Sequence, residues 1–477
     1  MQSEAARDRI GRCSNTYHRR NQVNPLATNG PSPSGTRRSS STVVALCFVI
    51  IVFDGYDLVV YGTTVPSLLA YQQWELTPGQ VGTIGSYALM GMLLGALLSG
   101  WLAPRVGARA IILTSLISFS VLMGLTALAP NPEIFGLLRF LGGLGLGGVV
   151  PTVIALTIEY SPPARRQFNN ALMYSGYSVG GVLAALSALA LLPENSFRVM
   201  YALGLLPLVT IVPLTWRYLP ESAAFLVGKG RNDEAQALAE KFGITAAPAT
   251  TSETRGTMSS LFTGARRVPL ALLVVASFCG LLLVYGVNTW LPNIMRQAGY
   301  SLGSSLTFLL VLNLGAIAGA LIASRIADRF GSKPVTVTSF LLAVLAILSL
   351  SLGLPLYAAM IVVAIAGLGT VGTQILVNGY VATYFGDRDR TSALGLSLGL
   401  GRVGAIFGPI LGGWIASSAL GVDWNFYSFA AFAGIGCLAV LFVSDRHSAN
   451  RQHADRSTAT TVSPAVRVDT ESKEAHS

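Results

Sequence analysis

The sequence has 477 residues, of which 52% are hydrophobic and only 11% are charged. Because soluble domains carry about 25% charged residues, this composition excludes an ordinary soluble protein and predicts an all-α membrane protein. The net charge of +10 would suit nucleic acid, but the basic residues stand in short clusters between apolar runs, which is typical of cytoplasmic loops. We therefore expect the lipid bilayer, and not nucleic acid, as a partner.

Twelve apolar runs are long enough to cross a bilayer, whose core of about 30 Å requires roughly 20 helical residues. In chain order they fall near 43–70, 79–102, 109–129, 134–158, 168–191, 197–218, 269–293, 303–327, 334–354, 356–384, 391–418 and 424–444. The polar residues gather before, between and after two sets of six runs. The predicted organisation is a disordered cytoplasmic tail at 1–41, six-helix halves at 42–218 and 268–445, a cytoplasmic linker at 219–267 and a second disordered tail at 446–477.

Lysine and arginine predict the orientation, because basic loops stay on the cytoplasmic side. Of the 32 basic residues, only Arg198 and Arg296 fall in the predicted outer loops, and only Arg139 and Arg402 fall inside runs. We therefore expect both termini to be cytoplasmic. The composition, rich in Ala, Gly and Leu and without an organelle signal, indicates a multi-pass protein of a bacterial inner membrane.

The positions of the histidines and cysteines indicate whether the chain could bind a metal or a haem. All four histidines lie in the predicted tails, and the four cysteines have neither paired nor metal-type spacing. The apolar runs contain no nucleophile or metal constellation, and no glycine-rich loop stands between a strand and a helix. We therefore expect no metal, no cofactor, no ATP hydrolysis and no enzymatic activity.

A short basic turn occurs between the second and third run of each half. Residues 101–109 read Trp-Leu-Ala-Pro-Arg-Val-Gly-Ala-Arg, and residues 325–333 read Arg-Ile-Ala-Asp-Arg-Phe-Gly-Ser-Lys. This repetition implies a duplicated six-helix unit, and two parallel halves with a central site are a transporter architecture.

Both turns resemble the loop signature G-x-L-A-D-R-x-G-R-R of the major facilitator superfamily. The resemblance implies that the loop acid and its basic neighbours latch the inward-closed state. The first copy has Pro104 where the acid is expected, so its latch is either lost or moved to Glu159. Alternatively, the arginines of that copy only anchor the loop at lipid headgroups. The candidate gating residues are Arg105, Arg109, Glu159, Arg165, Arg166, Asp328, Arg329 and Lys333.

The first run contains Phe53-Asp-Gly-Tyr-Asp-Leu-Val-Val-Tyr-Gly62, which resembles the D-G-x-D segment of the aromatic acid:proton symporter branch. Three further segments agree with that branch: 138–148, 288–292 and 399–404. The resemblance covers nearly all of 43–444. It implies a secondary active transporter that imports a benzoate- or hydroxybenzoate-type carboxylate with a proton by alternating access, and we expect a monomer to be the functional unit.

Charged side chains at bilayer depth are costly and usually face a cavity. Asp54 and Asp57 lie about half way along the first run and share one helical face with Tyr61. Two neighbouring carboxylates away from bulk water favour a shared proton, which proton coupling requires. The alternative is a structural salt bridge to Arg139 or Arg402.

An arginine facing a cavity is a good anion ligand, because it donates two parallel hydrogen bonds to a carboxylate. The resemblance places Arg139 in the proton-coupling network, although electrostatics alone would equally let it hold the substrate. We favour Arg402 as the carboxylate ligand and Arg139 as the partner of Asp54 or Asp57. The other candidate substrate contacts are Tyr61, Tyr174, Tyr177, Asn288, Trp290, Asn313, Gln374 and Asn378. An interface belt or helix packing is the alternative for each tyrosine, and a headgroup belt is the alternative for Trp290.

Two other functions fit the same fold. One is a proton-coupled drug or metabolite antiporter, a class with a G-x-x-x-G-P-x-x-G-G string in helix five. Here that string occurs at 404–413, in the eleventh run, which weighs against the antiporter. The other is a symporter for a non-aromatic acid such as muconate, which would satisfy the same charges.

Overall fold

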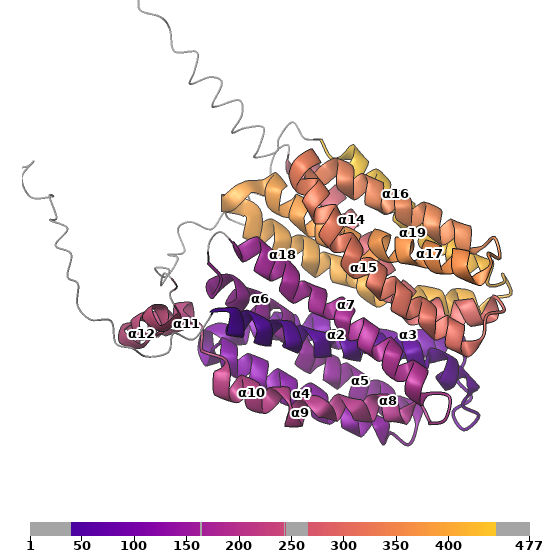
Figure 1. The fold of residues 1–477 in the computed structure, drawn as a ribbon, viewed down its shortest axis with the longest axis horizontal. Coiled ribbons are helices and arrows are strands. Elements are labelled where there is room, and N and C mark those ends of the chain that lie inside the picture. Colours follow the sequence, from indigo (N-terminus) through magenta and orange to yellow (C-terminus); the bar gives the residue numbers. More distant parts are fainter. Residues whose placement is uncertain (1–39, 163–164, 243, 245–265, 445–477) are drawn as a thin grey trace, which may run out of the picture. The chain divides into compact units, whose positions relative to one another are not determined.

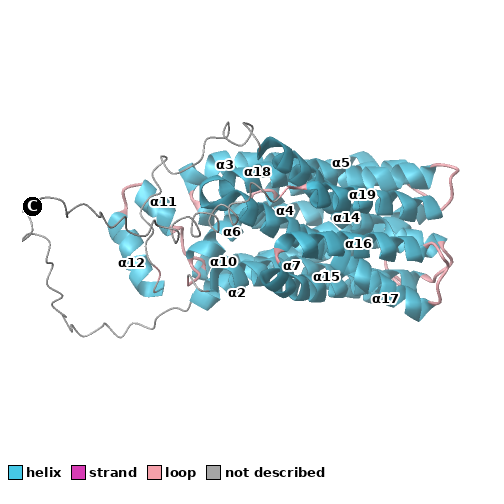
Figure 2. Cartoon of the chain, turned by 90° about the horizontal axis from the view of Figure 1, so that it is seen from above, coloured by secondary structure: helices cyan, strands magenta, loops and turns pink. Residues whose placement is uncertain are grey.

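The computed structural model describes residues 40–162, 165–242, 244 and 266–444. Within these ranges every regular element is a helix (Figures 1 and 2). Twelve of the helical stretches are long and apolar enough to cross a membrane, at Ser40–Ala70, Pro78–Val106, Ala108–Ala127, Pro132–Glu159, Phe168–Leu191, Arg198–Tyr218, Arg267–Gln297, Leu302–Phe330, Ser332–Leu350, Leu356–Phe385, Ser392–Ser417 and Asp423–Phe442. The twelve predicted spans are confirmed. The predicted tails lie outside the described residues, except that the first helix already begins at Ser40.

The first half is built from helices that often consist of more than one segment. In chain order they are α2 (Ser40–Ala70), α3 (Pro78–Val106), α4 (Ala108–Ala127), α5 (Pro132–Leu146), α6 (Val149–Glu159), α7 (Arg166–Leu191), α8 (Arg198–Ala202), the 3₁₀ turn η2 (Leu203–Leu205), α9 (Leu206–Val209) and α10 (Ile211–Tyr218). The fourth span joins α5 to α6, and the sixth span runs from α8 to α10. The interruptions fall at Gly147 and Gly148 and beside Pro207. Glycine destabilises a helix interior, and proline cannot donate a backbone hydrogen bond to the preceding turn.

The second half follows two short helices in the linker, α11 (Ala223–Gly228) and α12 (Asn232–Phe242). Its elements are α14 (Arg267–Gln297), α15 (Leu302–Phe330), α16 (Ser332–Leu350), α17 (Leu356–Gly367), the π-helical turn η5 (Leu368–Gly372), α18 (Thr373–Ser417) and α19 (Asp423–Phe442). The tenth span contains η5, and α18 supplies both the end of that span and the eleventh. A π-helical turn inside a helix is often found at functional positions.

The duplicated basic turn has the same backbone in both halves. Gly107 joins α3 to α4 with φ +91°, and Gly331 joins α15 to α16 with φ +92°. Residues that carry a side chain rarely adopt a backbone conformation with this positive φ, so each turn requires glycine. In each copy the glycine N–H donates to the carbonyl four residues earlier, Ala103 and Ala327 respectively. The repeat seen in the sequence is thus a structural repeat.

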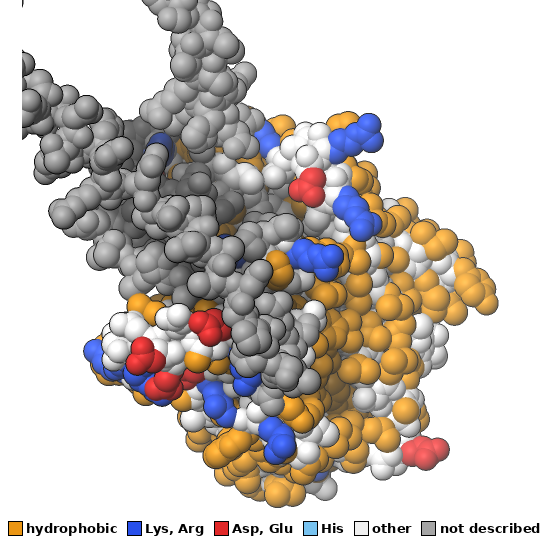
Figure 3. Space-filling view, turned by 60° about the vertical axis from the view of Figure 1, so that its left-hand side comes forward, with side chains coloured by type: hydrophobic (Ala, Val, Ile, Leu, Met, Phe, Trp, Pro, Cys, Tyr) orange, Lys and Arg blue, Asp and Glu red, His pale blue; other side chains and the backbone are white. Residues whose placement is uncertain are grey.

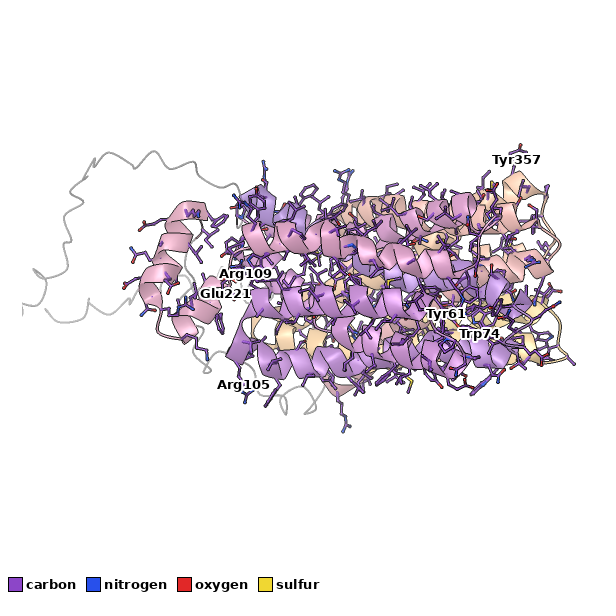
Figure 4. The ribbon with its side chains drawn as sticks, turned by 90° about the horizontal axis from the view of Figure 1, so that it is seen from below. Tyr61, Trp74, Arg105, Arg109, Glu221 and Tyr357 are labelled. Carbon is purple, nitrogen blue, oxygen red and sulfur yellow. The ribbon has the colours of Figure 1, made fainter. Side chains whose placement is uncertain are left out.

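Charged and aromatic residues distinguish the two ends of the helices. Figure 4 shows Arg105, Arg109 and Glu221 at one end, which we call the basic end, and Trp74 and Tyr357 at the other, which we call the opposite end. Figure 3 shows Lys and Arg side chains at the basic end and hydrophobic side chains over the flanks of the helices.

The two halves contact each other closely towards the opposite end. The Gly79 N–H donates to Ser417 Oγ at 2.8 Å, and Ser86 Oγ donates to the Ile406 carbonyl at 2.6 Å. A Cβ at Gly82 would lie 2.5 Å from the Pro409 carbonyl, so α3 and α18 meet backbone to backbone. These contacts close the space between the halves on this side.

Candidate functional site

An ion pair between α2 and α5 is buried in the first half. Arg139 of α5 donates from Nη1 to Asp57 Oδ1 at 2.7 Å, and the two side chains are 3% and 4% exposed. The same nitrogen lies 3.4 Å from the Asp57 carbonyl. The prediction that Arg139 pairs with one of the two acids is confirmed, and the partner is Asp57.

Tyrosine rings surround this pair. The Arg139 guanidinium lies 5.5 Å from the Tyr61 ring and 5.9 Å from the Tyr201 ring, within range of a cation–π interaction. Both hydroxyls are occupied: Tyr61 donates to the Val81 carbonyl, and Tyr201 bonds to Thr64. Tyr61, predicted to contact substrate, therefore packs on the ion pair in this structure. Tyr201 was missed, because nothing in its local sequence marks it as a partner of Arg139.

Asp54 differs from Asp57 although both are 2% exposed. Asp54 Oδ1 has no hydrogen-bond partner, and no ion pair to Asp54 occurs in the described part of the chain. The charge of Arg402, on α18 in the other half, acts on Asp54. Arg402 is half-buried and has neither an ion pair nor a hydrogen bond to any described residue. Asp54 and Arg402, which belong to different halves, are thus an acid and a base that form no ion pair with any described residue.

Tyrosines from both halves accompany Arg402. The charge of Arg402 also acts on Tyr174 of α7 and Tyr285 of α14. Tyr177 packs edge-on against Tyr285, with ring centroids 6.3 Å apart, and its hydroxyl has no partner. Tyr174 and Tyr177 were predicted at the site, whereas Tyr285 was missed. Its position three residues before Asn288, on the same helical face, is the signal that would have found it.

The four predicted amides form two bonded pairs. Asn313 Nδ2 donates to Asn288 Oδ1 at 3.1 Å, and Gln374 Nε2 donates to Asn378 Oδ1 at 3.2 Å. The remaining oxygens, Asn313 Oδ1 and Gln374 Oε1, are buried without a hydrogen-bond partner. A Cβ at Gly181 would lie 2.4 Å from Asn313 Oδ1, so this glycine makes room for the amide between the halves.

Trp290 lies in the packing between α14 and α18. Its side chain is fully buried, its Nε1 donates to the Pro409 carbonyl at 2.8 Å, and a Cβ at Gly412 would lie 2.3 Å from the indole. The alternative assignment of Trp290 to a headgroup belt is therefore wrong, because a belt residue must reach the membrane surface. Its indole N–H is already used, which leaves only its ring available for a substrate.

The gating residues of the first half are arranged differently from the prediction. Glu159 does not pair with Arg165 or Arg166, both of which are exposed. Its carboxylate accepts from Ser222 Oγ at 2.8 Å and from the Ala224 N–H at 2.9 Å, at the start of α11. A helix N-terminus offers free N–H groups and a partial positive charge. This explains why the Glu159 carboxylate binds the start of α11 and not Arg165 or Arg166.

Glu221 stands beside the first basic turn, which lacks its own acid. Glu221 Oε1 accepts from the Arg109 N–H at 3.1 Å, and the Arg109 guanidinium donates to the Trp216 carbonyl. The Tyr160 hydroxyl donates to the Glu221 carbonyl at 2.6 Å. Sequence reasoning missed Glu221, although it lies directly after the sixth span at the level of the turn.

The remaining basic-end residues make local contacts. Arg105 stacks on Trp101, 3.8 Å from its ring centroid, and Lys333 donates to the Val443 carbonyl at 2.6 Å. Asp328 and Arg329 are exposed, and no ion pair to Asp328 occurs among the residues described. The acid of the second turn is therefore available to a partner that this structure does not supply.

Twelve spans in two related halves, with unpaired ionisable groups buried between them, define the class of multi-pass membrane transporters. The described residues contain no group of three or more His, Cys, Asp or Glu side chains that could hold a metal ion. The family model described as Major Facilitator Superfamily matches residues 47–363 and 310–470.

Curated relatives match most of the chain. The benzoate transport protein of Acinetobacter baylyi is 35% identical over 85% of this chain and 89% of its own. The gentisate transporter of Corynebacterium glutamicum is 38% identical over 85% and 87%, and the gallate transporter of Pseudomonas putida is 33% identical over 84% and 90%. The chain belongs to the major facilitator superfamily, in the branch that contains these aromatic-acid transporters, and is a multi-pass protein of the bacterial inner membrane.

Solved structures show the same fold. The inward-open xylose transporter of Escherichia coli superposes with a TM-score of 0.68 at 18% identity, over 87% of this chain and 99% of its own. A bacterial homologue of the human lysosomal transporter Spinster, in an inward-facing conformation, gives a TM-score of 0.66 at 16% identity, over 87% and 100%.

Proposed function

We propose that this protein imports an aromatic carboxylate of the benzoate or hydroxybenzoate class together with a proton, by alternating access and as a monomer. The observation that carries the proposal is the division between four charged side chains inside the spans, three of them buried and one, Arg402, half-buried. Asp57 and Arg139 satisfy each other, whereas Asp54 and Arg402 have no ion-pair partner and lie in different halves. The names of the relatives support the aromatic acid as substrate.

Arg402 is the proposed ligand of the substrate carboxylate. Its guanidinium can donate two parallel hydrogen bonds to a carboxylate, and no described residue competes for them. Tyr174, Tyr177 and Tyr285 supply aromatic surface for the ring, and the unpaired Tyr177 hydroxyl supplies one polar contact. Arg139 is a poorer candidate, because its nearest acceptor is already Asp57.

Asp54 is the proposed carrier of the proton. With a carboxylate on Arg402 and a proton on Asp54, the closed site contains no unbalanced charge. Substrate alone would leave one excess negative charge away from water, which costs several kcal/mol. Without either ligand, Asp54 and Arg402 balance each other, so the empty carrier can also return. Substrate and proton therefore cross together because only the doubly loaded and the empty sites are neutral.

The proposed orientation places the basic end in the cytoplasm, following the distribution of Lys and Arg. The tight α3–α18 contacts then lie on the outer side, and the structure is closed to the outside. Opening that side requires Gly82 and Pro409 to separate while the basic end closes.

The antiporter string at 404–413 does not favour a drug antiporter. A Cβ at Gly404 would lie 2.1 Å from the Phe278 carbonyl, and one at Gly408 would lie 2.6 Å from the Leu282 carbonyl. These glycines let α18 pack closely on α14 within one half, which explains the string without a role in antiport.

Binding measurements on purified protein test the assignment of Arg402. Loss of a bidentate pair to a carboxylate costs about 1.5–3 kcal/mol, so Arg402→Gln should weaken binding of the preferred hydroxybenzoate by roughly ten- to a hundredfold. Arg402→Lys should restore only part of the affinity, because lysine cannot offer the planar fork. Arg296→Gln, which removes an exposed arginine far from the site, is the matched control. Unchanged affinity in Arg402→Gln would refute the assignment.

A further inference from the structure

Asn313 of α15 presents a buried hydrogen-bond acceptor between the two halves. Its side chain is fully buried, and Asn313 Oδ1 has no hydrogen-bond partner among the described residues. A Cβ at Gly181 of α7 would lie 2.4 Å from this oxygen, so the oxygen points from the second half towards the first. A buried acceptor without a donor is costly, so it calls for a donor that the protein itself does not supply.

The amide of Asn313 cannot be turned over to offer a donor instead. Asn313 Nδ2 donates to the Leu309 carbonyl at 3.0 Å and to Asn288 Oδ1 at 3.1 Å. Asn288 in turn donates from Nδ2 to the Val284 carbonyl at 2.7 Å. Because a backbone carbonyl can only accept, both amides are fixed in this orientation. Asn313 therefore offers a ligand an acceptor and no donor.

The other unpaired amide oxygen, Gln374 Oε1 on α18, faces its own half. A Cβ at Gly280 of α14 would lie 2.3 Å from this oxygen, and Gln374 Nε2 donates to Ser277 Oγ on the same helix at 3.2 Å. This amide therefore joins α18 to α14 within the second half. Of the two oxygens, Asn313 Oδ1 is the one that points at the other half.

The Asn288–Asn313 pair lies beyond Arg402 along the helices. The glycine two residues after Arg402 packs on the Phe278 carbonyl, so Arg402 leaves α18 near the level of Phe278 on α14. Tyr285, on which the Arg402 charge acts, lies between Phe278 and Asn288. The step from Phe278 to Asn288 is about 15 Å in an α-helix. An extended arginine side chain followed by a benzoate ring can span this length, with the carboxylate near Tyr285 and the far side of the ring near Asn313.

We propose that Asn313 Oδ1 accepts a hydrogen bond from a ring hydroxyl of the substrate, meta or para to the carboxylate that Arg402 binds. This inference rests on the proposed function and narrows the substrate to phenolic acids. A hydroxyl ortho to the carboxylate stays beside it and does not reach Asn313. Benzoate leaves the acceptor unpaired, and a methoxy group brings an oxygen without a proton. The site thus selects the donated proton and not the size of the ring.

Binding of matched acids to the purified full-length protein tests the assignment without any substitution. Isothermal titration calorimetry in detergent would compare benzoate, the three monohydroxybenzoates, and 3- and 4-methoxybenzoate at one pH. We expect the better of the 3- and 4-hydroxy acids to bind roughly ten- to a hundredfold more tightly than benzoate, because benzoate leaves a buried acceptor unpaired. The 2-hydroxy acid and both methoxy acids should bind no more tightly than benzoate.

Two variants locate the preference on Asn313. Asn313→Leu has nearly the same size without an acceptor, and should bring the affinities for benzoate and the preferred hydroxybenzoate to within about threefold of each other. The matched control is Asn425→Leu, the same change at a fully buried amide of α19 whose side-chain atoms have no hydrogen-bond partner. It should keep the wild-type preference. Thermal unfolding shows whether each variant folds, and if Asn313→Leu does not, the series of acids on the wild type still decides.

The possible failures are distinguishable. Equal affinity of the wild type for benzoate and the 3- and 4-hydroxy acids would overturn the inference and leave aromatic-acid transport standing. Methoxy acids that bind as tightly as the hydroxy acids would also overturn it, because the site would then respond to size. A preference that survives in Asn313→Leu would place the hydroxyl on another group. Absence of binding by every aromatic acid would instead refute the proposed function, and this inference with it.

Discussion

The two acids of α2 should respond in opposite ways to neutralisation. In Asp57→Asn, Arg139 keeps its full charge at 4% exposure and loses the carboxylate 2.7 Å away. Breaking a buried pair by removing one partner costs about 3–5 kcal/mol, because the remaining charge is uncompensated. Asp54→Asn removes a carboxylate that has no ion-pair partner, so the fold should be as stable as the wild type or more stable.

Thermal unfolding in detergent and transport in proteoliposomes separate the two effects. Asp57→Asn should unfold at a clearly lower temperature, and the double variant Asp57→Asn/Arg139→Gln should recover much of the loss, since no charge is then left alone. Asp54→Asn should unfold normally and fail to accumulate substrate against a gradient. It should still exchange labelled for unlabelled substrate, because exchange needs no net proton movement.

Two results would contradict this reasoning. The first is a double variant that is no more stable than Asp57→Asn, which would mean that the pair does not act as a unit. The second is accumulation of substrate by Asp54→Asn at the wild-type level, which would place the proton on another group.

Three further predictions concern packing and the basic end. Gly82→Ala should separate α3 from α18 and lengthen the distances between spin labels placed at the opposite end of each half. Gly100→Ala, where an added Cβ would have nothing within 4 Å, is the control in the same helix and should leave these distances unchanged. Trp290→Phe should lower the free energy of unfolding by about 1 kcal/mol through the lost bond to the Pro409 carbonyl and leave the KM for substrate unchanged; a raised KM would make it a substrate contact. Glu221→Ala leaves the Arg109 N–H without its acceptor and should destabilise the protein by about 1–3 kcal/mol in denaturant unfolding, and an unchanged midpoint would show that water replaces the carboxylate.

The spans and the repeated turn could be predicted because their signals are local. Length, hydropathy and the positions of Lys and Arg depend on short windows of sequence, and Gly107 and Gly331 mark a backbone conformation that few other residues adopt. Buried charges could also be identified one by one, since Asp54, Asp57 and Arg402 are expensive in any apolar span.

Partner choice could not be predicted, because it depends on how distant helices are rotated against each other. The sequence allowed Arg139 to bind either acid, and only the position of α5 relative to α2 selects Asp57. Glu159 was expected beside its neighbours in sequence, yet the helix start at Ser222 competes better for its carboxylate. Trp290 near a span end resembles a belt residue until α18 is seen to cover it.

Transport by the purified protein in proteoliposomes tests the central claim most directly. Labelled benzoate, hydroxybenzoates, gentisate and muconate would be supplied with an inward proton gradient and again after a protonophore has collapsed it. We predict accumulation of an aromatic acid that requires the gradient and disappears in Arg402→Gln. No uptake of any acid, together with proton-driven efflux of lipophilic cations, would contradict the symporter and favour an antiporter on the same fold.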